Sequence, residues 1–220
     1  MTQLTRRRLL AALAAAPILT PAMRASAQEA GLITGNVCLV QRETTEGPFY
    51  VDPGLVRADI TEGRLGVPMS LRMQVVDAGC RPIEGARVDV WHCDAEGLYS
   101  GVRAPNGNTT GETFLRGTQM TDASGVAAFR TIYPGWYRGR TPHIHYIVFL
   151  GGQSALTSQL FFPDCVSETV YGNAAAYAAR GAADTPNGAD GIARRAGEAA
   201  VANVGGSTAG LDAALVVGIA

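Results

Sequence analysis

The sequence predicts an all-β protein, a single antiparallel β-sandwich with short helices and long loops toward the C-terminus. Apolar and β-branched segments of strand length recur along the chain, turns with Gly and Pro separate them, and no long amphipathic helical pattern interrupts them. The chain has 220 residues, of which 47% are hydrophobic and 17% are charged. That length and composition fit one globular domain with a substantial core, which we place at residues 28–220.

The strands follow from the alternation of apolar and polar residues and from the turns between them. In chain order, the predicted strands are Ser70–Asp77, Ala86–His92, Val126–Ile132, His143–Leu150, Leu156–Phe162 and Gly210–Ile219. Turns are expected at Arg81–Gly85, before the second strand, and at Asp122–Gly125, before the third. Between the last two strands the chain is rich in Ala and Gly, and we expect short helices at Ala174–Arg180 and Asp190–Arg195.

The first 27 residues are predicted to be a cleavable signal peptide. Arginines within Thr5–Leu10 precede an apolar run that ends near Leu19, and Ala25–Ala27 forms a small-x-small cleavage site. The pair Arg6 and Arg7 resembles a twin-arginine signal, and an ordinary Sec signal is the alternative. The apolar run is too short to remain as a membrane span. We therefore expect an exported protein, periplasmic or extracellular, with no membrane anchor after cleavage.

Charge and cysteine content are consistent with export. Removal of the signal leaves 14 arginines against 19 acidic residues, a net charge of 14 − 19 = −5, and nothing in that balance indicates a nucleic-acid partner. Four cysteines would lie in a compartment that permits disulfides, namely Cys38, Cys80, Cys93 and Cys165. The pairing Cys80–Cys93 is disfavoured, since an intervening strand would hold the two too far apart. A thiolate metal ligand at Cys93 is a weaker alternative to a disulfide, and the oligomeric state is left open.

Two histidines, His143 and His145, lie in one apolar strand and point to the same face, because side chains alternate along a strand. Their backbone positions are about 6–7 Å apart, which suits a shared metal ion. A turn with Pro and Gly directly upstream carries Tyr137 and Arg140 toward the same face. The alternative is a strand with two exposed histidines, but the chain has only three histidines and two of them are in this motif.

The donor types indicate iron. Two imidazole nitrogens and a phenolate are borderline and hard ligands. Because a free phenol has a pKa of about 10, phenolate binding at neutral pH needs a strongly Lewis-acidic ion. Fe(III) meets this need better than Zn(II), whose sites use His, Cys or carboxylate, so a zinc or copper site is the weaker alternative. A second tyrosine, Tyr99, follows the end of a predicted strand in a loop with Gly and is the further ligand candidate.

With these motifs, the chain resembles the intradiol ring-cleavage dioxygenases, the family of the catechol 1,2-dioxygenases and the protocatechuate 3,4-dioxygenases. The shared segments are Glu46–Tyr50, Pro82–Ala86, Trp91–Tyr99, Pro134–His145 and Thr157–Phe162. They occur in this order over roughly residues 38–165, and as a set they are highly specific.

The resemblance implies one Fe(III) per chain and a defined ligand set. The four matching ligands are Tyr99, Tyr137, His143 and His145. Arg140 matches the arginine that stabilises negative charge on the substrate, and Gln159 matches a glutamine that lines the pocket for substrate and O2. Tyr137 matches the axial tyrosine, which leaves when catechol arrives and takes up a substrate proton. The implied partners are a catechol-type small-molecule substrate and O2, and the implied product is a cis,cis-muconate.

The chain departs from the intracellular members of this family. It lacks the long N-terminal helical region of the catechol 1,2-dioxygenases and carries an export signal and cysteines, so we expect an exported, single-domain branch. The rival prediction is an exported transthyretin-like β-sandwich that binds ligands without catalysis, because the Pro82–Ala86 turn also occurs there. That rival leaves the paired tyrosines, Arg140 and the two histidines unexplained. Whether the substrate is catechol, protocatechuate, hydroxyquinol or a lignin fragment is left open.

Other residues near the motifs are predicted to be structural. His92 shares a strand face with Val88 and Val90, which favours the core or a position behind the ligands. Core, pocket or packing positions are expected for Tyr50, Trp91, Tyr133, Trp136 and Tyr146. Asp94 and Glu96 are expected to cap their loop in solvent.

Overall fold

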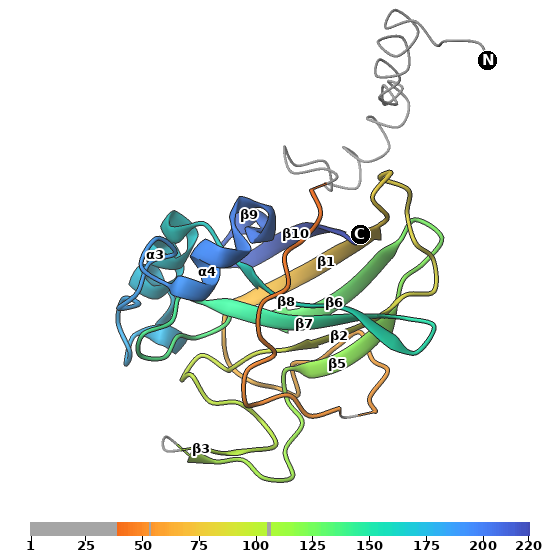
Figure 1. The fold of residues 1–220 in the computed structure, drawn as a ribbon. Helices are drawn as coiled ribbons and strands as arrows, with labels where there is room; N and C mark the ends of the chain where they lie inside the picture. The colour runs from red at the N-terminus through yellow and green to blue at the C-terminus, as the bar shows by residue number, and fades with distance from the viewer. Residues whose placement is uncertain (1–38, 53, 105–106) are drawn as a thin grey trace, which may run out of the picture.

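The structure is a computed structural model that describes residues 39–52, 54–104 and 107–220. The signal peptide predicted at residues 1–27 lies outside these ranges. Two four-stranded sheets form a sandwich, and the helices gather at one end of it (Figure 1). The predicted all-β sandwich with short helices toward the C-terminus is confirmed.

The first sheet has the strand order β6-β1-β10-β9 and the second has the order β5-β2-β7-β8. In chain order the strands are β1 (Pro68–Val76), β2 (Arg87–Trp91), β3 (Arg103–Ala104), β4 (Gly107–Asn108), β5 (Arg116–Met120), β6 (Val126–Ile132), β7 (His143–Leu150), β8 (Gln153–Phe161), β9 (Asn203–Ser207) and β10 (Gly210–Gly218). The connection from β8 to β9 contains α3 (Asp164–Asn173), η1 (Ala175–Tyr177), α4 (Gly191–Ala196) and η2 (Glu198–Ala200), where η marks a 3₁₀ turn. Within the described ranges, no helix is long and apolar enough to cross a membrane.

One strand pair departs from the antiparallel arrangement. β10 pairs in parallel with β1, with Leu71 opposite Ala213, while its other neighbour, β9, is antiparallel. A parallel pair needs a long crossover connection. The chain between β1 and β10 provides one, because it builds the second sheet, β6 and the helices. The last strand is thereby placed between β1 and β9.

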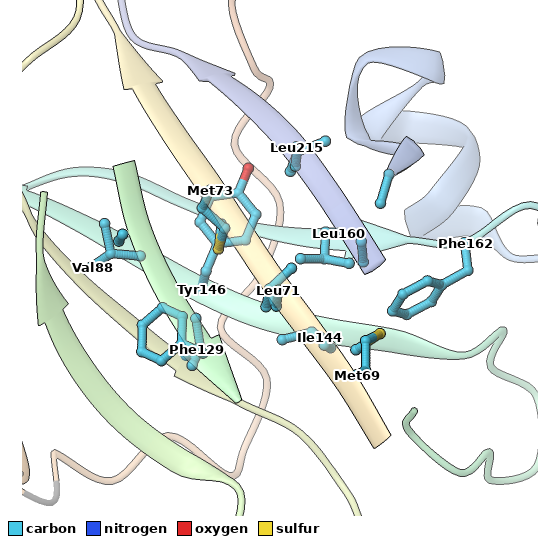
Figure 2. Packing of buried hydrophobic residues seen from close by; sticks show 14 of the residues in the cluster. Met69, Leu71, Met73, Val88, Phe129, Ile144, Tyr146, Leu160, Phe162 and Leu215 are labelled. Atoms are coloured by element: carbon cyan, nitrogen blue, oxygen red, sulfur yellow. The ribbon is translucent and has the colours of Figure 1, made fainter. Parts of the chain in front are cut away.

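The core lies between the two sheets. On β1, Met69, Leu71 and Met73 are buried at alternate positions and pack with inward residues of the second sheet (Figure 2). On β7 the inward residues include Ile144 and Tyr146. Because side chains alternate along a strand, the histidines on either side of Ile144 face the opposite side of the second sheet, as the sequence predicts.

The sequence pattern does not predict β5, β9 or α3. β5 reads Arg-Gly-Thr-Gln-Met, so no apolar alternation marks it, and it is a strand because it pairs with β2. β9 contains two consecutive glycines, and α3 buries too few side chains for a clear helical periodicity. The helix predicted at Ala174–Arg180 is only the 3₁₀ turn η1, whereas the one predicted at Asp190–Arg195 is α4.

Three of the cysteines lie in the described residues. Cys80 is disulfide-bonded, and Cys93 and Cys165 are free thiols. The disfavoured pairing of Cys80 with Cys93 is therefore absent. Burial raises the pKa of the Cys93 thiol to about 12, and its Sγ lies 3.4 Å from the carbonyl oxygen of Gly135. Cys93 is a buried free thiol, so the prediction of a disulfide there is wrong.

Candidate metal centre

The candidate site is built on the outer face of the second sheet, where a row of side chains crosses four strands. Strand register places Trp91 of β2 between Arg116 of β5 and His145 of β7, and it places His145 opposite Gln159 of β8. His143 begins β7, two residues before His145, so the two imidazoles project from the same face. The sheet thus provides a rigid floor for both histidines.

Four donor atoms from the predicted ligands converge beside β7. Nε2 of His143 lies 3.2 Å from Nε2 of His145, 2.9 Å from the phenol oxygen of Tyr137 and 3.4 Å from that of Tyr99. Three of these side chains are buried, and Tyr137 is half-buried. The structure therefore brings together all four residues that the sequence predicts as ligands.

Both imidazoles are neutral at physiological pH. Burial lowers the pKa of His143 to about 3 and holds the pKa of His145 well below its ordinary value. Nδ1 of His143 faces the carbonyl oxygen of Thr141 at 2.7 Å, so Nδ1 carries the proton and Nε2 presents its lone pair to the shared position. A neutral imidazole with an available lone pair is the form that binds metal ions.

The two tyrosines are neutral phenols unless a cation lies beside them. Burial raises the pKa of Tyr99 well above 10 and that of Tyr137 to about 12. Tyr99 packs against Phe49, with ring centroids 4.8 Å apart. The ring of Tyr137 is edge-on to those of Tyr99 and His143. Ionising these phenols here requires a strongly Lewis-acidic ion.

Arg140 and Gln159 form a polar wall beside the donor atoms. Nη2 of Arg140 donates to Oε1 of Gln159 at 2.6 Å, and Nη1 lies 3.5 Å from the phenol oxygen of Tyr137. Gln159 is fully buried, and its Nε2 donates to the carbonyl oxygen of Thr45. A guanidinium in this position can stabilise negative charge on a group bound next to Tyr137.

Close packing fixes the ring of His145. Trp91 stacks on it with ring centroids 5.0 Å apart, which confirms Trp91 as a packing residue. At Gly47, where φ is +70°, a Cβ would lie 3.1 Å from Cε1 of His145. Glycine alone combines a left-handed backbone with so close an approach. The Glu46–Tyr50 motif therefore acts by covering the histidine.

His92 is a core residue and not a ligand, as predicted. Its Nδ1 is hydrogen-bonded to the carbonyl oxygen of Cys93, and its Nε2 to Oγ1 of Thr131. The other aromatic residues predicted to be structural pack in or against the core between the sheets or the aromatic cluster around Trp91, namely Tyr50, Tyr133, Trp136 and Tyr146. Asp94 caps its loop as predicted, by accepting from two backbone N–H groups, but it is buried and not in solvent.

Sequence patterns do not identify Asp190 and Arg116 as parts of the site. Oδ2 of Asp190 accepts a hydrogen bond from Nε of Arg140 at 2.8 Å, although the two residues are 50 positions apart in the sequence. An Asp before a short helix indicates an N-cap, but only the folded structure shows that Asp190 also contacts Arg140. Arg116 is buried, and its Nε and Nη2 donate to Ser100, the residue after Tyr99. Arg116 lies in β5, a strand that the sequence pattern does not predict, so its position beside the site could not be predicted either.

The donor set fits a hard, highly charged ion. Two phenol oxygens and two imidazole nitrogens share one position, a combination that suits Fe(III). In the described part of the chain, no three His, Cys, Asp or Glu side chains gather as zinc and calcium sites require. The fold and the site therefore define a β-sandwich protein with a candidate mononuclear metal centre made of two histidines and two tyrosines.

Comparisons with known proteins identify the family. A family model described as a dioxygenase matches residues 45–181. A catechol 1,2-dioxygenase of Acinetobacter baylyi is 30% identical over an alignment of 164 residues, and the match covers 63% of this chain and 50% of the relative. A hydroxyquinol 1,2-dioxygenase of a Rhizobium species is 32% identical over an alignment of 146 residues, and the match covers 55% of this chain and 47% of the relative. The chain thus spans about half the length of the curated relatives it matches.

Solved structures agree with this result. An intradiol ring-cleavage dioxygenase from Tetranychus urticae is 32% identical with a TM-score of 0.75, and the match covers 83% of this chain and 94% of that one. The dioxygenase domain of a carbohydrate-binding fusion protein from Streptomyces sp. SirexAA-E is 26% identical with a TM-score of 0.61, covering 82% and 97%. The chain belongs to the intradiol ring-cleavage dioxygenase family. This membership favours an enzyme over the transthyretin-like rival.

Proposed function

We propose that the protein is a non-haem Fe(III)-dependent dioxygenase that inserts O2 between the two hydroxyl-bearing carbons of a catechol-type aromatic to give a cis,cis-muconate. The observation that carries this proposal is the convergence of two phenol oxygens and a second imidazole nitrogen within 3.4 Å of Nε2 of His143. Membership of the intradiol family and the names of the relatives support it. We expect one Fe(III) per chain, held by Tyr99, Tyr137, His143 and His145.

Fe(III) would supply Lewis acidity that activates a catecholate toward O2. The side chains provide the remaining functions. The ionised oxygen of Tyr137 is the base that takes up a catechol proton. The guanidinium of Arg140 stabilises negative charge that develops on the substrate. Gln159 orients that guanidinium through Oε1, and Trp91 excludes water from the floor of the site.

We further propose that residues 1–27 direct export, so that residues 28–220 act as a periplasmic or extracellular domain. The twin-arginine pattern at Arg6 and Arg7 supports export. The disulfide at Cys80 also supports it, because disulfides persist in oxidising compartments and are rare in the cytosol.

The test is O2 uptake by the iron-loaded protein with catechol, protocatechuate and hydroxyquinol, followed by identification of the products. We expect equal amounts of O2 and catechol to be consumed, and a cis,cis-muconate from at least one substrate. Protein loaded with Zn(II) is the control and should consume no O2. Two outcomes would contradict the proposal. In one, iron-loaded protein shows a tyrosinate absorption band but consumes no O2. In the other, it cleaves the ring at a bond that is not between the two hydroxyl-bearing carbons.

A further inference from the structure

Asp190 is a buried carboxylate that joins two parts of the chain. It is 2% exposed, lies directly before α4, and is beyond residue 181, where the family match ends. Its Oδ2 accepts from Nε of Arg140 at 2.8 Å and from the backbone N–H of Thr141 at 3.1 Å. Its Oδ1 accepts from the backbone N–H groups of Ile192 at 2.7 Å and Ala193 at 3.2 Å. One oxygen thus caps α4, and the other holds the turn that carries Arg140.

Two partners fix the guanidinium of Arg140. Nε bonds Asp190 and Nη2 bonds Gln159, while Nη1 faces the phenol oxygen of Tyr137. Because a guanidinium is planar, directed bonds at two different nitrogens set both its plane and its position. The side chains of the ion pair are only 18% and 1% exposed, so water screens it little.

Asp190 is also the charge partner of Arg140. Among the residues that the structure describes, no other carboxylate lies within ion-pair distance of this guanidinium. Arginine keeps its charge at every pH that proteins tolerate. Without Asp190 the guanidinium would stay charged and lose the contact that directs it, so it would turn toward solvent or toward the tyrosine oxygens.

We propose that Asp190 is a positioning residue that holds the Arg140 guanidinium against the catechol-binding position, so that the segment after residue 181 completes the site. The inference rests on the proposed function, because it gives Asp190 the task of orienting a group that acts on the substrate. A capping role alone would engage one carboxylate oxygen. The second oxygen of Asp190 instead accepts hydrogen bonds from Arg140 and from the backbone N–H of Thr141.

Two variants separate the capping role from the positioning role. In Asp190→Ser, the hydroxyl still caps α4, since Ser and Asp are similarly good N-caps, but it offers Arg140 neither a second oxygen nor a negative charge. In Asp190→Asn, which keeps the size of the side chain if the serine variant folds poorly, the single oxygen can serve α4 or Arg140 but not both. The matched control is Asp164→Ala. Oδ1 of Asp164 accepts from the backbone N–H of Asn187, so its loss loosens the same segment without touching Arg140.

The experiment is a double-mutant cycle of Asp190→Ser with Arg140→Ala. It is read out on turnover and on the anaerobic binding of 4-nitrocatechol, which reports on the site without chemistry. We expect Asp190→Ser to lower kcat or the affinity for 4-nitrocatechol about 10–100-fold, with iron content and melting temperature close to wild type. In the Arg140→Ala background, the same change should have no further effect, because the group that it orients is gone. Asp164→Ala should match wild type in both readouts.

Equal losses from Asp190→Ser in both backgrounds would overturn the inference, because Asp190 would then act on the fold and not through Arg140. An Asp190→Ser enzyme with wild-type kcat and wild-type affinity would overturn it as well. Failure of the proposed function would look different. Wild-type protein would then contain iron, yet neither bind 4-nitrocatechol nor consume O2 with any catechol, and the inference would fall with it.

Discussion

Tyr99 and Tyr137 are held in the site in different ways. Tyr99 is 4% exposed, packs against Phe49, and has its carbonyl oxygen bonded by Oγ1 of Thr109, so both its ring and its backbone are fixed. Tyr137 is half-buried and lies two residues before Gly139, where φ is +79° and the chain turns. Tyr99 is therefore the more enclosed of the two phenols, and Tyr137 is the more exposed one, next to a turn.

We expect Tyr99→Phe and Tyr137→Phe to behave differently. Tyr99→Phe should lower the iron content and change the resting colour, because it removes a permanent ligand. Tyr137→Phe should keep its iron and bind catechol slowly. Its anaerobic catechol complex should then have the wild-type spectrum, since this tyrosine is the one expected to leave. Visible spectra with and without catechol, measured together with iron content, test this. A wild-type-like complex from Tyr99→Phe beside an altered one from Tyr137→Phe would reverse the two roles.

Burial of His92 makes stability depend on pH. Burial lowers the pKa of His92 from 6.5 to about 4, so the folded protein keeps this ring neutral at pH values where the unfolded chain protonates it. Between these two pKa values the unfolded state binds more protons, and the free energy of unfolding falls as the pH falls, by at most about 1.4 kcal/mol per pH unit. Above pH 6.5, His92 is neutral in both the folded and the unfolded state, so its contribution to the free energy of unfolding no longer changes with pH.

For the iron-loaded protein, we expect the free energy of unfolding to drop about 2 kcal/mol more in wild type than in His92→Gln when the pH is lowered from about 7 to about 5. Glutamine is polar but cannot titrate. The two ligand histidines are present in both proteins, so their contributions cancel. Urea unfolding at both pH values measures the difference. Equal drops in the two proteins would mean that another group is responsible.

At the scale of single residues, the candidate ligands could be identified as candidates from the sequence because their signals are local. His143 and His145 share a strand face whatever the rest of the fold does, and each tyrosine follows a turn or a strand end. Asp190 and Arg116 could not be predicted as parts of the site. Their partners lie 50 and 16 residues away, and nothing in the spacing of the residues marks contacts that the topology creates.

Among the elements, the predictable strands are those whose own sequence is distinctive. β6 and β7 have the predicted bounds, because alternating or continuous apolar residues are bounded by clear turns. β5 has no such pattern, and its pairing with β2 makes it a strand. This matters for the site, since β5 places Arg116 beside the loop of Tyr99.

Gly135 lies where the two tyrosine-bearing loops meet. It is buried, and its backbone N–H donates to the carbonyl oxygen of Asp94 at 3.0 Å. A Cβ at this position would overlap that oxygen and lie 2.7 Å from the carbonyl oxygen of Ala95. Both are backbone atoms, so neither can rotate away. An added methyl group must therefore push apart the loops that carry Tyr99 and Tyr137.

We expect Gly135→Ala to lower the free energy of unfolding by about 1–3 kcal/mol and the affinity for iron about 10–100-fold. Gly172→Ala is the control, because Gly172 lies in α3 with open space around the added Cβ. That change should leave iron binding intact and stabilise the helix by up to about 1 kcal/mol. Urea unfolding and iron titration measure the two effects. Wild-type values for Gly135→Ala would show that the loops do not need this close contact.

In the whole molecule, the sandwich separates the groups that hold the fold from the groups of the site. The apolar core lies between the sheets (Figure 2), whereas the ligand candidates lie on the outer face of the second sheet or in loops beside it. The sequence identifies β10 as a strand, but its parallel pairing with β1 could not be predicted. The alternation of apolar and polar residues in a strand does not indicate which strand it pairs with or in which direction.

The candidate ligands come from two loops and a strand and meet only after folding, so the proposed iron binding would depend on the complete fold. A twin-arginine signal would export the protein already folded and loaded, whereas a Sec signal would require loading after export. We expect the combined change Arg6→Lys and Arg7→Lys to stop periplasmic accumulation of iron-loaded protein and to leave a coloured precursor in the cytoplasm. Arg8→Lys, next to the pair, should export normally. Iron content and visible absorbance of the two cell fractions measure this, and unchanged export of the double variant would identify a Sec signal instead.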